Sequence, residues 1–348
     1  MVCWGGGGSQ SVLPDRLAIV HILLYIAFID FSNLSIVSMA TGSPPTRGKR
    51  NRISFPTDSL SGSPERLTFS GHETFQCRSL WLKKGFDFLR AGNKFNQPDA
   101  VVHLGVGKNM VSSIRYWMNA FGFCTERDPL AKFLFGPTGR DPYLERSGSL
   151  WLLHHRLVTN RVASIFSLVF NEFRRGRQEF TREQILKFLS QKCQESEDPF
   201  NAHIVDRDIG VFLKTYLRPR NKVQNIEEEF AGIFLELDVI RELEPMDGTG
   251  KRYRIPVNER KDLPIEVVLF CILNNRKYGN SISFFDLLND KDSVGSVFAL
   301  SGDGLMEKIN AITRSYKGIT YLDNAGIREL QFKEKPDPWH ILKGYYEN

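Results

Sequence analysis

The residue pattern on either side of Gly105 is the feature that most constrains how this chain folds. Apolar residues recur at helical spacing before it, up to Leu104, and after it, from Val111 to Met118. Gly105 can supply the left-handed conformation that a tight turn between two helices needs. This order of residues predicts a helix-turn-helix over residues 97–121, the motif that places its second helix in the major groove of DNA.

The second helix of this pair is expected to begin near Lys108 and to be polar in its N-terminal half, where recognition helices contact bases and phosphates. A helical hairpin packed inside a larger domain would show the same apolar order without binding DNA, and this alternative stays open. The candidate DNA-contacting residues are Lys108, Asn109, Ser112, Ser113 and Arg115.

The composition is that of a globular protein, with 348 residues of which 41% are hydrophobic and 25% charged. These values exclude a mostly disordered or fibrous chain. The formal net charge of +6 permits nucleic-acid binding but does not by itself argue for it. The five cysteines form no Cys-x-x-Cys pair, so we expect neither a zinc ribbon nor a disulfide framework, and a cytoplasmic location.

Residues 1–66 differ from the rest of the chain, and we interpret them as a disordered or non-native leader. The apolar run Leu17–Ile29 is shorter than the about 20 residues that a membrane-spanning helix needs, so no membrane partner is expected. Residues 1–38 are open to three interpretations: native sequence, a signal-peptide-like segment, or mis-assigned sequence upstream of a start at Met39.

Residues 67–177 are predicted to form an N-terminal helical domain that contains the helix-turn-helix. Ser70 and Glu73 have the spacing of a capping box, so we expect a helix to begin there, with an inward apolar stripe from Phe75 to Leu89. Two further apolar helices are expected over residues 148–158 and 160–173.

Residues 178–260 and 261–348 are each predicted to form a winged-helix-like module. In the first module, a capping box at Thr181 and Gln184 and a helix over 206–217 precede a β-prone segment. In the second, helices precede two strands joined by a turn at 323–326. The expected fold class is mainly α, with tandem helix-turn-helix and winged-helix modules that carry small β-hairpin wings.

The sequence offers no clear catalytic motif. The Gly-x-Ser-x-Gly, His-Glu-x-x-His and protein-kinase patterns do not occur. His154 and His155 point about 100° apart on a helix, which does not suit a metal pair, and Asp206 and Asp208 are interpreted as part of a solvated helix face. We therefore expect no catalytic residue, no bound metal and no cofactor.

Several sequence blocks together resemble one prokaryotic family, the domain of unknown function 4007. The resemblance runs from about residue 68 to the C-terminus and is strongest before residue 220; the long leader departs from the family's compact start. The blocks are Phe69–Phe75, Cys77–Arg78, Leu80–Gly85, Gly105–Arg115, Asp141–Glu145, Leu150–His154 and Phe170–Phe173.

The resemblance implies a genomic context for the protein but no specific reaction. Members of the family are encoded near sulfur-transfer enzymes of the PAPS-reductase type, in loci for DNA phosphorothioation and phage defence. No established catalytic residue can be transferred to this chain. Four residues within the matching blocks are candidates for a family-motif site: His72, Glu73, Arg78 and Asp141. A hydrogen bond from the His72 ring to a neighbouring helix or to a ligand is the hypothesis for that residue.

The sequence is consistent with three functions. The first is a protein that binds double-stranded DNA as an accessory or regulatory component of a modification and defence system. The second is a scaffold that does not touch DNA and holds a sulfur-transfer or nuclease partner. The third is a nuclease or sulfur-transfer enzyme whose site is assembled from dispersed residues such as His72, Glu73 and Asp141.

Overall fold

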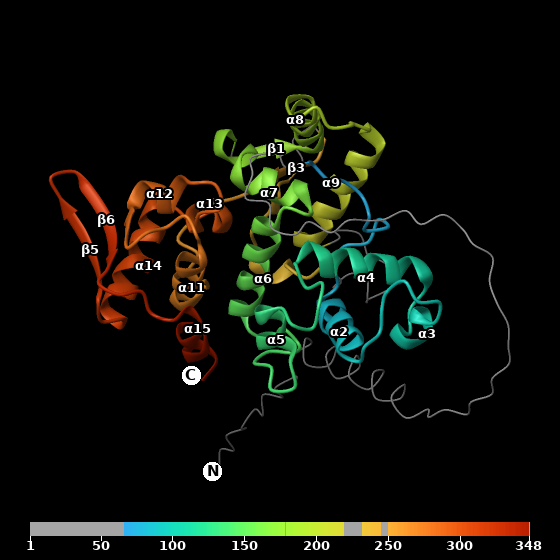
Figure 1. Cartoon of the computed structure of the whole chain (residues 1–348). Coiled ribbons are helices and arrows are strands. Elements are labelled where there is room, and N and C mark those ends of the chain that lie inside the picture. The colour runs from blue at the N-terminus through green and yellow to red at the C-terminus, as the bar shows by residue number, and fades with distance from the viewer. Residues whose placement is uncertain (1–65, 178, 219–231, 245–249, 348) are drawn as a thin grey trace, which may run out of the picture. The chain divides into compact units, whose positions relative to one another are not determined.

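A computed structural model describes residues 66–177, 179–218, 232–244 and 250–347 (Figure 1). These residues are mainly helical, with two small antiparallel sheets, which confirms the mainly α prediction. They all belong to one compact unit that spans residues 63–348. Apart from Arg66, the leader that the sequence predicts lies outside the described residues.

The first part of this unit is a group of helices in which α2 contacts α3, α4 and α5. A wide apolar stripe on each helix faces its neighbours, and Trp117, Phe121 and Phe135 are fully buried between them. The elements are α2 (Ser79–Arg90), α3 (Ala100–Leu104), α4 (Lys108–Ala120), α5 (Pro129–Phe135), α6 (Ser147–Asn160), α7 (Ser164–Asn171) and the short 3-10 helix η1 (Phe173–Gly176).

Two helix boundaries differ from the sequence prediction. The capping box at Ser70 and Glu73 is wrong, because both residues have positive φ values of 72° and 48° and α2 begins only at Ser79. The helix expected over residues 160–173 is present but shorter, over Ser164–Asn171. Arg161 adopts the left-handed conformation at φ 61°, so α6 ends at Asn160 and a separate helix, α7, follows.

The second part contains a sheet in the order β1-β3-β2 and two helices that pack on each other. The Thr181 hydroxyl accepts the Gln184 N–H while the Gln184 side chain accepts the Thr181 N–H, which confirms this capping box. The elements are β1 (Glu179–Thr181), α8 (Arg182–Glu195), α9 (Ala202–Tyr216), η2 (Leu235–Leu237), β2 (Arg241–Glu242) and β3 (Arg252–Arg254).

The third part carries a sheet in the order β4-β6-β5. Its hairpin turns at Ala325 and Gly326, which both have positive φ, as a two-residue type I′ turn requires. The elements are α11 (Ile265–Asn274), β4 (Ser281–Ser283), α12 (Phe284–Asn289), α13 (Val294–Phe298), α14 (Gly302–Ser315), β5 (Ile319–Asn324), β6 (Ile327–Phe332) and α15 (Pro338–Glu347).

The same element order occurs twice along the chain. Among the described residues, and apart from the 3-10 helices η1 and η2, one helix, a short strand, two or three helices and two strands follow each other from α7 to β3 and again from α11 to β6. In both sheets the last strand lies in the middle and pairs antiparallel with the other two.

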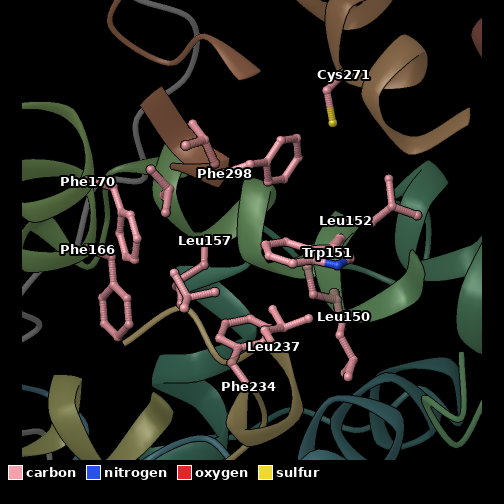
Figure 2. Packing of buried hydrophobic residues seen from close by; sticks show 14 of the residues in the cluster. Leu150, Trp151, Leu152, Leu157, Phe166, Phe170, Phe234, Leu237, Cys271 and Phe298 are labelled. Atoms are coloured by element: carbon pink, nitrogen blue, oxygen red, sulfur yellow. The ribbon is translucent and has the colours of Figure 1, made fainter. Parts of the chain in front are cut away.

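Helix α6 lies at the centre of the largest apolar core (Figure 2). His154 on this helix is completely buried; its Nε2 donates to the Val297 carbonyl oxygen at 2.9 Å and its Nδ1 accepts from the Tyr216 hydroxyl at 2.9 Å. The buried Arg260 and the partly buried Arg174 donate to carbonyl oxygens of α13. The histidine therefore has a structural role that links α6 to α9 and α13.

Candidate functional site

Helices α3 and α4 are joined by a short turn at the place where the sequence predicts it. Gly105 follows α3 in the left-handed conformation, at φ 60° and ψ 34°, and α4 begins at Lys108. The Gly105 N–H donates to the Val102 carbonyl oxygen and the Val106 N–H donates to that of Val101, so the turn closes the end of α3 through the backbone alone.

The exposed face of α4 holds four of the five candidate DNA-contacting residues. Lys108, Asn109 and Arg115 are exposed and Ser112 is partly exposed. The outward orientation expected for Ser113 is wrong, because its side chain is completely buried and its hydroxyl has no hydrogen-bond partner among the described residues. Ser113 lies one helical turn before Trp117, which is also fully buried, so the inner face of α4 is wider than the sequence pattern indicates.

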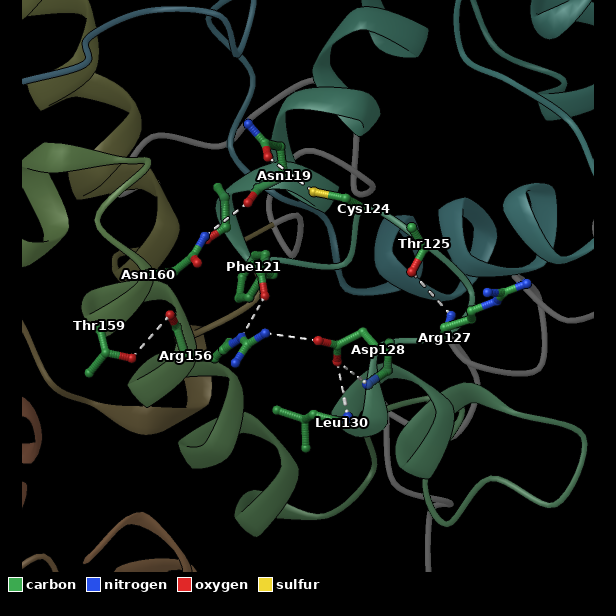
Figure 3. Close-up of polar contacts among 12 residues, drawn as sticks. Asn119, Phe121, Cys124, Thr125, Arg127, Asp128, Leu130, Arg156, Thr159 and Asn160 are labelled. Carbon is green, nitrogen blue, oxygen red and sulfur yellow. Dashed lines mark hydrogen bonds and ion pairs between the residues drawn. The ribbon is translucent and has the colours of Figure 1, made fainter. Parts of the chain in front are cut away.

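The inner face and the C-terminal end of α4 are packed tightly against α2 and α6. A Cβ atom on Gly85 of α2 would come within 2.7 Å of the Met118 sulfur, which shows how closely α2 and α4 approach. At the C-terminal end, the Asn160 amide donates to the carbonyl oxygens of Asn119 and Ala120, and Arg156 Nε donates to that of Phe121 (Figure 3). These side chains of α6 satisfy backbone groups that a helix end otherwise leaves unpaired.

The N-terminal end of α4 has features that favour the binding of an anion. Its first turn carries no acidic residue, and Gly107 precedes it without a side-chain cap. A Cβ atom on Gly105 or on Gly107 would meet no atom within 4 Å, so the backbone here is open to a ligand. The positive end of the helix dipole and the exposed Lys108 therefore act in the same direction on a phosphate group.

His72 forms a buried pair with Asp208 of α9. His72 Nε2 lies 2.9 Å from Asp208 Oδ1, and the Thr74 N–H donates to His72 Nδ1 at 3.1 Å. Because Nδ1 accepts this hydrogen bond, Nε2 carries the hydrogen and donates to Asp208. This bond to Asp208 is the hydrogen bond from the His72 ring to a neighbouring helix that the sequence led us to expect. The Ser70 N–H also donates to both carboxylate oxygens of Asp208 at 3.0 Å.

This pair fixes the segment Ser70–Thr74 against α4. The ring of Tyr116 contacts the His72 ring edge-on at 5.5 Å, and a Cβ atom on Gly71 would come within 2.7 Å of the Tyr116 ring. Burial raises the pKa of the Tyr116 hydroxyl, and the Asp208 carboxylate raises it further. The segment thus packs as a structural support beside the exposed face of α4.

The other family-motif residues do not join this pair. Glu73 is exposed, and the Arg78 guanidinium lies over the Trp81 ring at 5.5 Å. Asp141 is buried, and it accepts the N–H groups of Glu145 and Arg146 and the hydroxyl of Ser149. Each of these residues therefore serves its own local structure.

Sequence reasoning missed Asp208, which was assigned to a solvated helix face. It is 2% exposed, and it lies four residues before Phe212 and eight before Tyr216, both on the inner face of α9. Helical periodicity was the signal that places it inside. In the described part of the chain, no three His, Cys, Asp or Glu side chains are grouped so that they could hold a metal ion, and no helix has both the length and the apolarity to cross a membrane.

Residues 69–346 match the family described as Protein of unknown function (DUF4007). The chain belongs to this family. No curated protein matches it. Two solved structures are similar to this DUF4007 protein, a crystal structure of SspB and a magnesium ion-bound crystal structure of SspB. Each has a TM-score of 0.70 and 27% sequence identity, over 81% of this chain and 88% of the other.

Proposed function

We propose that this protein binds double-stranded DNA through the exposed face of α4, as an accessory or regulatory component of a modification and defence system. The observation that carries the proposal is the exposure of Lys108, Asn109 and Arg115 on a helix that follows a tight glycine turn. A recognition helix needs this combination of a rigid support and a free polar N-terminal half.

The polar residues on α4 are spaced so that they can contact the same DNA duplex together. Lys108 and Arg115 are seven residues apart, which places them on nearly the same side of the helix and about 10 Å apart along its axis. Ser112 lies between them on that side. Lysine and arginine neutralise phosphates, and arginine and asparagine also form paired hydrogen bonds with guanine and adenine edges.

We infer that the two repeated units are winged-helix modules. Their element order and their sheet order, with the last strand in the middle, support this assignment. Two of their helices, α9 and α14, are less suited to DNA than α4. Helix α9 is buried along most of its length, and the exposed face of α14 mixes Asp303 and Glu307 with Arg314. These modules are therefore better placed to hold a protein partner, such as the sulfur-transfer enzyme that the family resemblance implies.

One observation favours a second candidate, a magnesium-dependent nuclease: a magnesium ion-bound structure is among the similar ones. In the described part of the chain, no three His, Cys, Asp or Glu side chains are grouped as ligands of one ion, so no metal-binding cluster supports this candidate. His72 and Asp141 are already bonded within the protein. Cleavage of plasmid DNA in the presence of magnesium is the direct test of this candidate.

Alanine substitutions on α4 test the DNA-binding proposal. Lys108→Ala and Arg115→Ala are each expected to weaken duplex binding. The loss of one phosphate contact should lower the slope of log affinity against log salt by about one, and the loss of a base contact should cost about 1–3 kcal/mol at one base position. Fluorescence anisotropy with labelled duplexes at several salt concentrations measures both quantities.

The matched control is Lys343→Ala, which removes an exposed lysine of α15 that pairs with Glu347 and is expected to leave binding unchanged. Circular dichroism of all variants should match that of the unmodified protein. If Lys108→Ala and Arg115→Ala both bind a duplex as tightly as the control, α3 and α4 form a structural hairpin and the scaffold function is the better assignment.

A further inference from the structure

A pocket of about 290 Å³ lies on the side of α2 that faces α5. Helix α2 contacts α4 and α5 through different residues, with Gly85 close to α4 and Phe86 in ring contact with Phe135 of α5 at 6.2 Å. The pocket is therefore distinct from the exposed face of α4. Its lining residues are Phe86, Arg90, Glu126, Arg127, Lys132 and Pro137.

The side chains that line this pocket carry more positive than negative charge. It is lined by three cations and one carboxylate, a formal charge of +2, and one of the cations, Arg90, also lies 3.5 Å from the Asp87 carboxylate of its own helix. Arg127 and Glu126 approach each other only to 3.5 Å, with the Arg127 side chain 89% exposed, so this pair is weak. Lys132 has no ion pair within the described part of the chain. The pocket thus holds more positive charge than its own acidic residue neutralises.

The segment that brings Arg127 to the pocket is fixed by its neighbours (Figure 3). Asp128 accepts the N–H groups of Leu130 and Ala131 and so caps α5, and its other carboxylate oxygen lies 2.8 Å from the Arg156 guanidinium. The Arg127 N–H also donates to the Thr125 hydroxyl. Two of the three cations therefore project from a backbone that is already in place, which reduces the entropy lost on binding an anion.

We propose that this pocket binds a terminal phosphate group. A phosphate monoester carries close to two negative charges at neutral pH, more than the single charge of a phosphodiester in a strand, and it therefore gains more from a lining in which cations outnumber carboxylates. Arg90 and Arg127 can each form paired hydrogen bonds with phosphate oxygens, and Lys132 adds a compact charge. Of the two apolar lining residues, Phe86 is 1% exposed and Pro137 is exposed, so Pro137 supplies the apolar surface against which carbon atoms of the ligand can pack.

Two sources can supply this chemistry: a free phosphate compound or the 5′-phosphorylated end of a nucleic acid. The test measures binding of the full chain to a labelled single-stranded oligonucleotide with either a 5′-phosphate or a 5′-hydroxyl, with inorganic phosphate and a nucleoside monophosphate as separate competitors. The variants are Lys132→Ala and Arg90→Ala, and the control is Lys187→Ala, which removes an exposed lysine of α8.

The loss of a charged contact in the pocket should weaken binding of the phosphate group about tenfold. A 5′-phosphate preference that disappears in Lys132→Ala supports the pocket with a nucleic-acid end as ligand. Competition by inorganic phosphate or the monophosphate that depends on Lys132, without an end preference, supports it with a free ligand. Equal binding of all phosphate probes by Lys132→Ala, Arg90→Ala and the control overturns it.

Phosphate binding in the pocket and duplex binding by α4 can be tested independently of each other. Lys108→Ala should keep phosphate binding in the pocket, and Lys132→Ala should keep duplex binding through α4. The result that rejects one therefore leaves the other in place.

Discussion

Replacement of Asp208 by alanine is expected to lower the free energy of unfolding by about 1–3 kcal/mol for each hydrogen-bond donor that loses this carboxylate as its acceptor. The Asp208 carboxylate is 2% exposed and accepts hydrogen bonds from the Ser70 N–H and the His72 ring. Without it, both donors remain buried or partly buried and unpaired. Urea denaturation of the full chain measures the loss.

Asp206→Ala is the matched control for this prediction. Asp206 lies on the same helix, two residues earlier, and its side chain is 45% exposed beside Arg182. An ion pair at the surface contributes about 0–1 kcal/mol, so this variant should stay close to the unmodified protein. If Asp208→Ala were no less stable than Asp206→Ala, the buried pair with His72 would not hold the segment in place.

His154 is expected to make the protein sensitive to acid. Burial lowers the pKa of this histidine from 6.5 to about 3, although the hydrogen bond to Val297 acts in the opposite direction. The unfolded chain therefore takes up a proton below pH 6.5 while the folded chain does not, and stability is lost as the pH falls from that value towards 3. From pH 7 to about pH 5 the expected loss from this one group is about 2 kcal/mol.

The change in unfolding free energy between these two pH values is the quantity to compare among variants. His154→Gln cannot titrate, so its loss should be smaller than that of the unmodified protein, whatever its stability at neutral pH. His103→Gln changes an exposed histidine beside Asp99 and should keep the full loss. Identical losses in all three proteins would show that His154 accepts a proton without cost to the fold.

Local sequence patterns predicted the helices and the main turns well. The α3–α4 pair, the capping box at Thr181 and the hairpin at 323–326 depend on residues close together in the chain. The failures depend on distant contacts. Ser70 and Glu73 have the spacing of a capping box, but the Ser70 N–H is bonded to Asp208, 138 residues away. No local pattern carries that information.

The same distinction applies to the strands and to the candidate sites. The three-residue strands β1 and β4 exist only because later strands pair with them, so no pattern of their own indicated them. Ser113 was placed outside because it is polar, while the packing of α4 buries it. Arg90, Arg127 and Lys132 come from three separate segments, and only the folded chain brings them to one pocket.

The salt dependence of duplex binding by the full chain tests the central proposal most directly. If Lys108 and Arg115 each neutralise one phosphate, the plot of log affinity against log salt should be linear with a slope of about −2 or steeper, at about −0.9 for each contact. A folded protein that binds no duplex at low salt, or binds it with an affinity that does not change with salt, would contradict DNA binding through α4.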